Sequence, residues 1–157
     1  MEKTLNYPGD RLGHKPAAAL YLMLIAWMTV MVGCGDGRPE RVAISGRVLI
    51  DGKPLKLGYI RFVTEGARPA WANIDPDGRF TLETFGDHDG AVLGTHKILV
   101  RASETLGPYK LKWHAPKKYA DARTSGLTET IDRPNDNLLI NLIWDGGKPF
   151  IETTSSK

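Results

Sequence analysis

Cysteine is almost missing from this sequence, which has a single one, Cys34, among 157 residues. One thiol cannot close an intramolecular disulfide bond, and it cannot build a cysteine-based zinc or iron–sulfur site. The chain also has only four histidines, so few side chains are available to bind a transition metal. We therefore expect the hydrophobic core to stabilise the fold without disulfides or metal, and we predict no cofactor.

A strong excess of one charge is also missing, since 21 Lys and Arg residues stand against 18 Asp and Glu residues and the net charge is +3. The longest run of like charges is the pair Lys117 and Lys118. Proteins that bind nucleic acid usually carry a clearly basic patch or stripe. The composition therefore gives no reason to expect a nucleic-acid partner.

Long apolar runs are restricted to residues 17–32, sixteen residues in which Thr29 is the only one that is not apolar. A membrane-spanning helix needs about 20 such residues, whereas the core of a signal peptide needs about 7–15. Lys3, Arg11 and Lys15 precede the run and give it the positive flank that keeps the amino end in the cytoplasm. We predict that residues 1–33 are a signal peptide for export.

The residues that end this run are Met31, Val32, Gly33 and Cys34, with an aliphatic and a small residue directly before the cysteine. They resemble the lipobox of bacterial lipoproteins, although Met31 stands where that motif usually has leucine. The resemblance implies cleavage before Cys34, a diacylglycerol group on its thiol, and a protein held to a membrane on the periplasmic or cell-surface side. Residues 34–40 then form a flexible tether. In the alternative, Cys34 is a free thiol behind an ordinary signal peptide or an uncleaved anchor.

Alternation of apolar and polar residues marks the rest of the chain as short strands. The segment 41–50 shows the pattern, with one face made of Val42, Ile44, Val48 and Ile50. Comparable segments cover residues 58–63, 71–74, 79–83, 96–101, 127–131 and 137–144. Turn sequences such as Asp51-Gly52 and Asp75-Pro76-Asp77-Gly78 separate some of them. No segment after Cys34 has the period of an amphipathic helix.

These segments predict an all-β domain, a small antiparallel β-sandwich of short strands over residues 41–145. A long connection from Ser103 to Ser125 has no clear periodicity, and residues 146–157 are predicted to be a polar tail. A domain of about 120 residues removes roughly two thirds of its unfolded surface from water. That burial is enough for the domain to fold independently.

Three strings resemble carboxypeptidase-regulatory-like domains, which are also described as transthyretin-like or prealbumin-like. They are VAISGRVLIDGKPL at 42–55, DPDGRFTL at 75–82 and LGTHKILV at 93–100. In the third string Leu93 and His96 replace the usual proline and aromatic residue. The resemblance implies a Greek-key sandwich of about seven strands without catalytic residues. With the lipobox, the chain is similar to the small envelope lipoproteins of planctomycete bacteria that carry one such domain.

The loop Asp87-His88-Asp89 is a weak candidate for a metal site, because it places three ligating side chains in a row. A zinc site needs three or four convergent ligands, and the other histidines after Cys34 lie far away in sequence. The turn from Asp75 to Gly78 runs directly into a predicted strand, unlike a calcium-binding EF-hand loop. We interpret both as solvated turns that hold no metal.

No arrangement of residues predicts catalysis. The single cysteine is assigned to lipid, and the G-x-S-x-G elbow of many hydrolases does not occur. Asp132 and Asp136 are close in sequence, but they belong to a polar turn in which carboxylates are usually solvated. We predict that the protein is not an enzyme.

The segment from Trp113 to Tyr119 is aromatic and basic, and it lies inside the long connection. Loops on a rigid scaffold often carry binding residues, so the candidate contact surface consists of Trp113, Lys117, Lys118 and Tyr119. In the alternative, this segment packs onto its own sandwich. Two other tryptophans occupy strand positions and are expected in the core, namely Trp71 and Trp144.

The sequence as a whole predicts a non-catalytic, lipid-anchored module of the cell envelope. Its partners are the membrane, through the lipid on Cys34, and envelope proteins or glycans. The alternative is a carbohydrate-binding or metal-assisted envelope protein. A cluster of exposed aromatic side chains would favour glycan binding, and convergent His and Asp residues would favour the metal.

Overall fold

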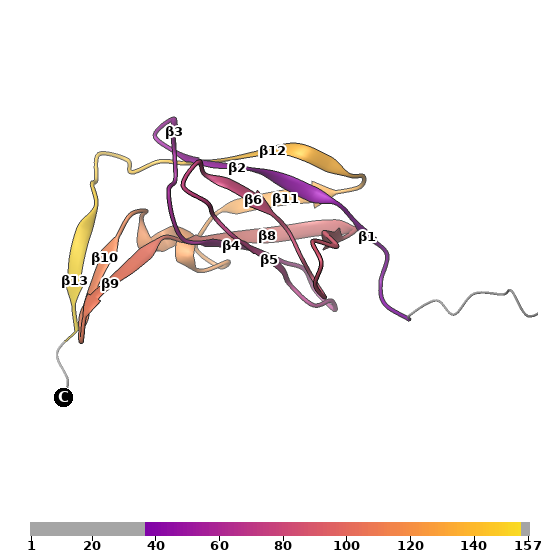
Figure 1. Ribbon diagram of the computed structural model, residues 1–157, viewed down its shortest axis with the longest axis horizontal. Coiled ribbons are helices and arrows are strands. Elements are labelled where there is room, and N and C mark those ends of the chain that lie inside the picture. The colour runs from indigo at the N-terminus through magenta and orange to yellow at the C-terminus, as the bar shows by residue number, and fades with distance from the viewer. Residues whose placement is uncertain (1–36, 155–157) are drawn as a thin grey trace, which may run out of the picture. The chain divides into compact units, whose positions relative to one another are not determined.

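Strands make up about half of the chain in the computed structural model, which describes residues 37–154 (Figure 1). The elements are β1 (Arg41–Val42), β2 (Ile44–Ile50), β3 (Lys53–Pro54), β4 (Tyr59–Val63), β5 (Ala70–Asn73), β6 (Arg79–Thr81), β7 (Ala91–Val92), β8 (Gly94–Arg101), β9 (Ser103–Gly107), β10 (Lys110–Trp113), the 3-10 turn η2 (Lys117–Ala120), β11 (Leu127–Ile131), β12 (Asn135–Leu142) and β13 (Phe150–Thr153). The prediction of an all-β domain is confirmed. The predicted signal peptide and Cys34 lie outside the described residues.

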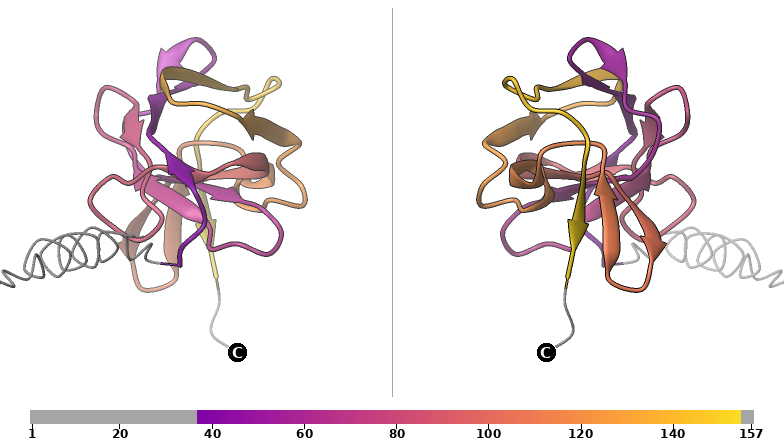
Figure 2. Two further views of the ribbon diagram at one scale, coloured as in Figure 1. Left: turned by 90° about the vertical axis from the view of Figure 1, so that its right-hand side faces the viewer. Right: turned by 90° about the vertical axis from the view of Figure 1, so that its left-hand side faces the viewer.

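Two four-stranded sheets form the body of the fold (Figure 2). In the first sheet β2 pairs with β12 on one side and with β3 and β6 on the other, and the second sheet has the order β11-β8-β4-β5. The strands are antiparallel except for β2 and β12, which run parallel. This pair brings an early strand beside a late one. Its two strands must be joined by a long crossover rather than a hairpin.

The two sheets are joined at one edge by a short bridge. Trp71 of β5 and Glu83, which follows β6, exchange two backbone hydrogen bonds, each with an N···O distance of 2.9 Å. The predicted turn also forms here, because Gly78 N–H donates to the carbonyl of Asp75 at 2.9 Å. The outer surface of the first sheet therefore continues from β6 onto β5.

The core fills the space between the sheets, where strand residues alternate between inside and outside. Its largest fully buried apolar side chains are Phe62, Ile60, Leu82, Ile98 and Leu142. His96 is also buried and lies against the ring of Phe62 with centroids 5.9 Å apart. Its Nε2 lies 2.7 Å from the carbonyl of Val92, so Nε2 is the protonated ring nitrogen that donates to it. An imidazole thus fills the aromatic position of the sequence motif.

Gly46 allows the parallel pair to form. A Cβ atom at this position would lie 2.0 Å from the carbonyl oxygen of Leu138, which belongs to the backbone of β12. The register between β2 and β12 also shifts at this point, between Asn135 and Leu138. Any larger residue at position 46 would force the two strands apart.

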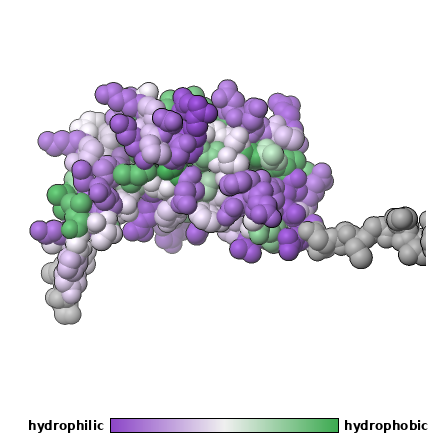
Figure 3. All heavy atoms as spheres, in the orientation of Figure 1, coloured by the Kyte–Doolittle hydropathy of each residue, from purple (hydrophilic) through white to green (hydrophobic). Residues whose placement is uncertain are grey.

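A third sheet of order β13-β10-β9 extends from the body. Two predictions are wrong here, because the long connection contains the hairpin β9–β10, and the predicted polar tail contains strand β13. Both outer strands are short, and β13 exposes Phe150 and Ile151 at 40% and 57%. In the space-filling view of Figure 3, apolar residues lie in small groups between polar ones, and one such group covers this end.

Candidate functional site

The aromatic side chains of the predicted contact surface are buried. Trp113 and Tyr119 are only 4% and 5% exposed, so of the two interpretations of this segment, the exposed contact surface is wrong for both rings. Trp113 lies on β10, and the guanidinium of Arg101 and the ammonium of Lys117 lie 5.4 Å and 5.5 Å from its ring centroid. The hydroxyl of Tyr119 contacts the backbone of Ile143. The alternative, in which these rings pack against the protein's own fold, is confirmed.

The two lysines of the predicted surface are exposed but partly engaged. Lys117 donates to Glu152 Oε1 at 2.7 Å, and Trp113 Nε1 donates to the other carboxylate oxygen at 2.9 Å. The hydrogen bond from Lys117 and then that from Trp113 lower the pKa of Glu152 below its ordinary value. Lys118 lies over the ring of Tyr119 at 5.0 Å. The hydrogen bonds from Lys117 and Trp113 to Glu152 attach β13 to the fold.

The loop at Asp87, His88 and Asp89 is a capped turn. Asp89 Oδ1 accepts hydrogen bonds from the backbone N–H groups of Thr84 and Phe85 at 2.7 Å and 3.2 Å. Asp87 and His88 are exposed and both have a φ of 56°, and His88 also lines a pocket with Asp75 and Glu83. Among the described residues, no group of three or more His, Cys, Asp or Glu side chains is placed to hold a metal ion.

Asp89 also forms an ion pair, since its Oδ2 lies 2.9 Å from Nε of Arg41. Burial acts to raise the pKa of Asp89, but the hydrogen bonds from Thr84 and Phe85 and the charge of Arg41 outweigh it. The pKa of Asp89 is therefore lowered overall. These contacts hold the turn next to β1, the first strand of the fold.

The tryptophans that were expected in the core are not fully buried. Trp71 is 37% exposed, so its predicted place in the core is wrong. Trp144 is half-buried and makes an edge contact with Phe150 at a centroid distance of 6.4 Å. Trp71 lies on β5 between the buried residues Ala70 and Ala72, which means that its side chain points to the outside.

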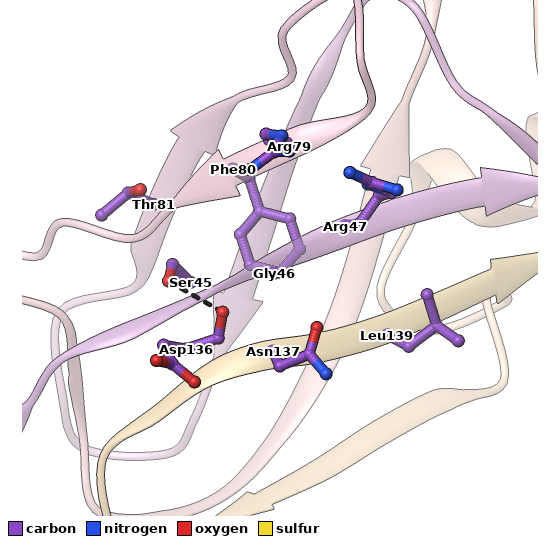
Figure 4. Close-up of a pocket in the computed structure, with 9 residues that line it drawn as sticks. All are labelled: Ser45, Gly46, Arg47, Arg79, Phe80, Thr81, Asp136, Asn137 and Leu139. Atoms are coloured by element: carbon purple, nitrogen blue, oxygen red, sulfur yellow. Dashed lines mark hydrogen bonds between the residues drawn. The ribbon is translucent and has the colours of Figure 1, made fainter.

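A pocket of about 380 Å³ lies on the outer face of the first sheet (Figure 4). Residues of β2, β6 and β12 line it, and most of them have outward side chains. Arg47 of β2 is paired in register with Arg79 of β6 on one side and with Leu139 of β12 on the other. Ser45 and Thr81 form the next such pair. We name this site the arginine pocket, and its polar lining consists of Ser45, Arg47, Arg79, Thr81, Asp136 and Asn137.

The two arginines carry like charges at directly opposed positions, which destabilises an antiparallel pair. Within residues 37–154, neither guanidinium has a hydrogen bond or an ion pair. Asp136 lines the same pocket, but its backbone carbonyl, and not its carboxylate, accepts the hydrogen bond from Ser45 Oγ at 3.4 Å. The fold therefore presents two cationic groups side by side whose donors remain available.

Comparisons with known proteins do not assign this site. No protein-family model matches the chain, and neither the curated proteins nor the solved structures contain a significant match. The residues described also include no helix that is long and apolar enough to cross a membrane. The function must therefore be inferred from the chemistry of the chain's own residues.

A second pocket of about 280 Å³ adjoins the arginine pocket. The two share Arg79, Phe80 and Thr81, so they lie on either side of strand β6. Trp71 lines the second pocket, as do the acidic residues Asp75 and Glu83. The exposed indole and the paired guanidinium groups therefore belong to one continuous outer surface.

Sequence reasoning missed the arginine pocket because its residues come from three separate strands. The alternation in segment 41–50 places Arg47 outside, and the alternation in segment 79–83 does the same for Arg79. The signal was thus present for each residue alone. Their juxtaposition depends on the pairing of β2 with β6, which a hydrophobic pattern does not specify.

Proposed function

We propose that this protein is a non-catalytic, lipid-anchored module of the cell envelope that binds an anionic ligand at the arginine pocket. The observation that carries the proposal is the pair Arg47 and Arg79 without a carboxylate partner among the described residues. Guanidinium groups bind carboxylate, sulfate and phosphate through paired hydrogen bonds. A ligand of this kind would remove the repulsion between the two arginines.

The anchor rests on the sequence. The apolar run 17–32 and the lipobox-like residues up to Cys34 support export and lipid attachment. Each buried methylene of an acyl chain contributes about 0.8 kcal/mol, and two or more chains hold a protein stably to a bilayer. The similarity to carboxypeptidase-regulatory-like domains, with the all-β fold, supports a role as an accessory module rather than an enzyme.

Localisation is tested by expressing the full chain in a bacterium and separating its proteins with a phase-partitioning detergent. We expect wild-type protein in the detergent phase, with mass spectrometry showing diacylglycerol on an amino-terminal Cys34. The Cys34→Ser variant should lose the lipid and move to the aqueous phase. An uncleaved, unmodified wild-type chain in the cytoplasm would refute the anchored model.

Binding is tested by nuclear magnetic resonance on the full-length protein in detergent micelles. Inorganic sulfate is titrated while the Nε–Hε signals of Arg47 and Arg79 are followed. We expect both signals to shift in a saturable way, whereas Arg133, whose side chain is 82% exposed, serves as the control and should show no saturation. Equal, unsaturable shifts at all three arginines would contradict an anion site.

A further inference from the structure

Three features of the outer surface lie next to each other across β12, β2, β6 and β5. The first is the lining of the arginine pocket, which includes a leucine, two hydroxyl groups and an amide. The second is the pair of guanidinium groups at its centre, and the third is the indole of Trp71 beyond β6. We propose, on the basis of the function proposed above, that this surface binds an acidic polysaccharide. An anionic group of one sugar lies between Arg47 and Arg79, and a neighbouring sugar ring stacks on Trp71.

The aromatic contact is the feature that selects a sugar over a free anion. Trp71 is 37% exposed although it stands on a regular strand, and it lines the pocket that also contains Arg79 and Thr81. An exposed aromatic ring offers a flat, electron-rich apolar face, on which the C–H face of a pyranose can pack. An inorganic anion would gain nothing from this ring.

The remaining polar groups match the hydroxyl groups of a sugar. Ser45 and Thr81 face each other across β2 and β6, and the amide of Asn137 lines the same pocket from β12. Hydroxyl and amide side chains both donate and accept hydrogen bonds. The arginine pocket continues across β6 into the second pocket, because Arg79, Phe80 and Thr81 line both, and this continuity suits an extended sugar chain.

The acidic residues restrict where the ligand can carry its charge. Asp136 stands in the arginine pocket beside β2, and Asp75 and Glu83 line the pocket on the other side of β6. Carboxylates at these places repel anionic groups that approach them, whereas the centre between Arg47 and Arg79 attracts one. The arrangement therefore favours a polysaccharide in which acidic and neutral sugars alternate over one that is acidic at every residue.

The test measures binding of defined oligosaccharides to the full-length lipoprotein in micelles by calorimetry. The probes are an oligomer of alternating glucuronate and N-acetylglucosamine, an oligogalacturonate, an uncharged cello-oligosaccharide and free glucuronate. We expect the alternating oligomer to bind most tightly, and its affinity to fall as sodium chloride is raised. The uncharged oligomer should bind weakly or not at all.

Variants separate the two parts of the surface. Arg47→Gln and Arg79→Gln should each weaken the alternating oligomer by about tenfold or more, because each removes charge-assisted hydrogen bonds. Trp71→Ala should weaken it by about fivefold and leave the sulfate response of the arginines unchanged. Arg133→Gln and Tyr109→Asn are controls, since Arg133 and Tyr109 are exposed and line neither pocket. Thermal melting confirms that every variant is folded.

The outcomes distinguish this inference from the function on which it rests. The wild-type protein could bind sulfate saturably but bind the alternating oligomer no more tightly than free glucuronate, with no effect of Trp71→Ala. That result would overturn the proposed polysaccharide ligand and keep the anion site. Equally tight binding of oligogalacturonate would overturn the alternating pattern. If the wild-type protein binds neither sulfate nor any of the oligosaccharides, the proposed function is overturned as well.

Discussion

At the scale of single residues, two positions show how a side chain, or its absence, determines the local fold. Gly46 lies where the backbone of β12 approaches β2 most closely, and Asp89 joins a turn to the first strand. Neither residue contributes apolar surface to the core. Gly46 acts through its close approach to the backbone of β12, whereas Asp89 acts through hydrogen bonds to backbone N–H groups and an ion pair with Arg41, so replacing Gly46 tests packing and replacing Asp89 tests electrostatics.

We predict that Gly46→Ala destabilises the protein. The added methyl group would overlap the backbone carbonyl of Leu138, and backbone cannot move aside as a flexible side chain can. Overpacking of this kind typically costs about 1–3 kcal/mol. Chemical denaturation should show the loss, and Ser45→Ala, one position earlier on the outer face, should change stability by less than about 0.5 kcal/mol. Equal stability of Gly46→Ala and wild type would mean that the strands separate without cost.

A second prediction concerns pH and Asp89. Because its pKa is lowered in the folded protein, the unfolded chain binds the proton more readily, and the stabilising contribution is complete above the ordinary Asp pKa of about 3.9. It is lost as the pH falls through the lowered value. Asp89→Asn should therefore cost about 1 kcal/mol at pH 7 and progressively less below pH of about 4.

Denaturation of both proteins across this pH range provides the measurement. Asp77→Asn is the matched control, because Asp77 is an exposed aspartate in another turn. A difference between wild type and Asp89→Asn that stays constant down to pH of about 2 would show that the charge of Asp89 does not contribute.

At the scale of elements, strand β13 depends on few contacts. It pairs with β10 alone and exposes most of its residues, and Glu152 connects it to Lys117 and Trp113. Glu152→Gln should remove the ion pair and keep an acceptor for the indole N–H. We expect faster amide hydrogen exchange in residues 150–153 and no change in β12, measured by mass spectrometry. Unchanged exchange in β13 would assign its attachment to backbone pairing alone.

The strands that the sequence predicted and those that it did not differ in a physical way. Segments 41–50 and 137–144 alternate over many residues because each lies between core and solvent, and both form strands. Strands β9, β10 and β13 have little core beneath them, so they carry no long alternation and were predicted as loop and tail.

The burial of two tryptophans was also predicted wrongly from the sequence pattern. Trp71 was expected inside because it stands on a strand, but its neighbours Ala70 and Ala72 are the buried residues. Trp113 was expected outside because its segment has no period, yet Arg101, Lys117 and Glu152 enclose it. The arginine pocket was missed for a third reason, since strand pairing between distant segments creates it.

At the scale of the whole molecule, β12 is required for the first sheet to be complete. It pairs with β2, which is about ninety residues earlier in the chain, and it buries Leu138, Ile140 and Leu142. Folding must therefore wait for the carboxyl-terminal third, and such non-local pairing is slow, with times from milliseconds to seconds. Refolding that is already complete within the millisecond dead time of stopped-flow mixing would contradict this topology.

We further predict that a chain ending before Asn135 does not fold. Removal of β12 exposes the edge of β2 and three core side chains. Circular dichroism should then lack the sheet signal and the cooperative thermal transition. A chain that ends at Thr154 is the control and should melt like the full-length protein. A cooperative transition in the shorter chain would show that the second sheet folds alone.

The close approach at Gly46 also bears on the register between β2 and β12. A shift of β2 along its neighbours by one residue would exchange the two faces of the strand. Arg47 would then point into the hydrophobic core, and Val48 would be exposed to solvent. A slip by one residue would place Ser45 or Arg47 opposite the carbonyl of Leu138, where a Cβ atom has no room, so the register with Gly46 at this place is favoured. Gly46, which contacts no ligand itself, therefore keeps the charge of Arg47 on the outer face of the sheet, where a ligand would bind.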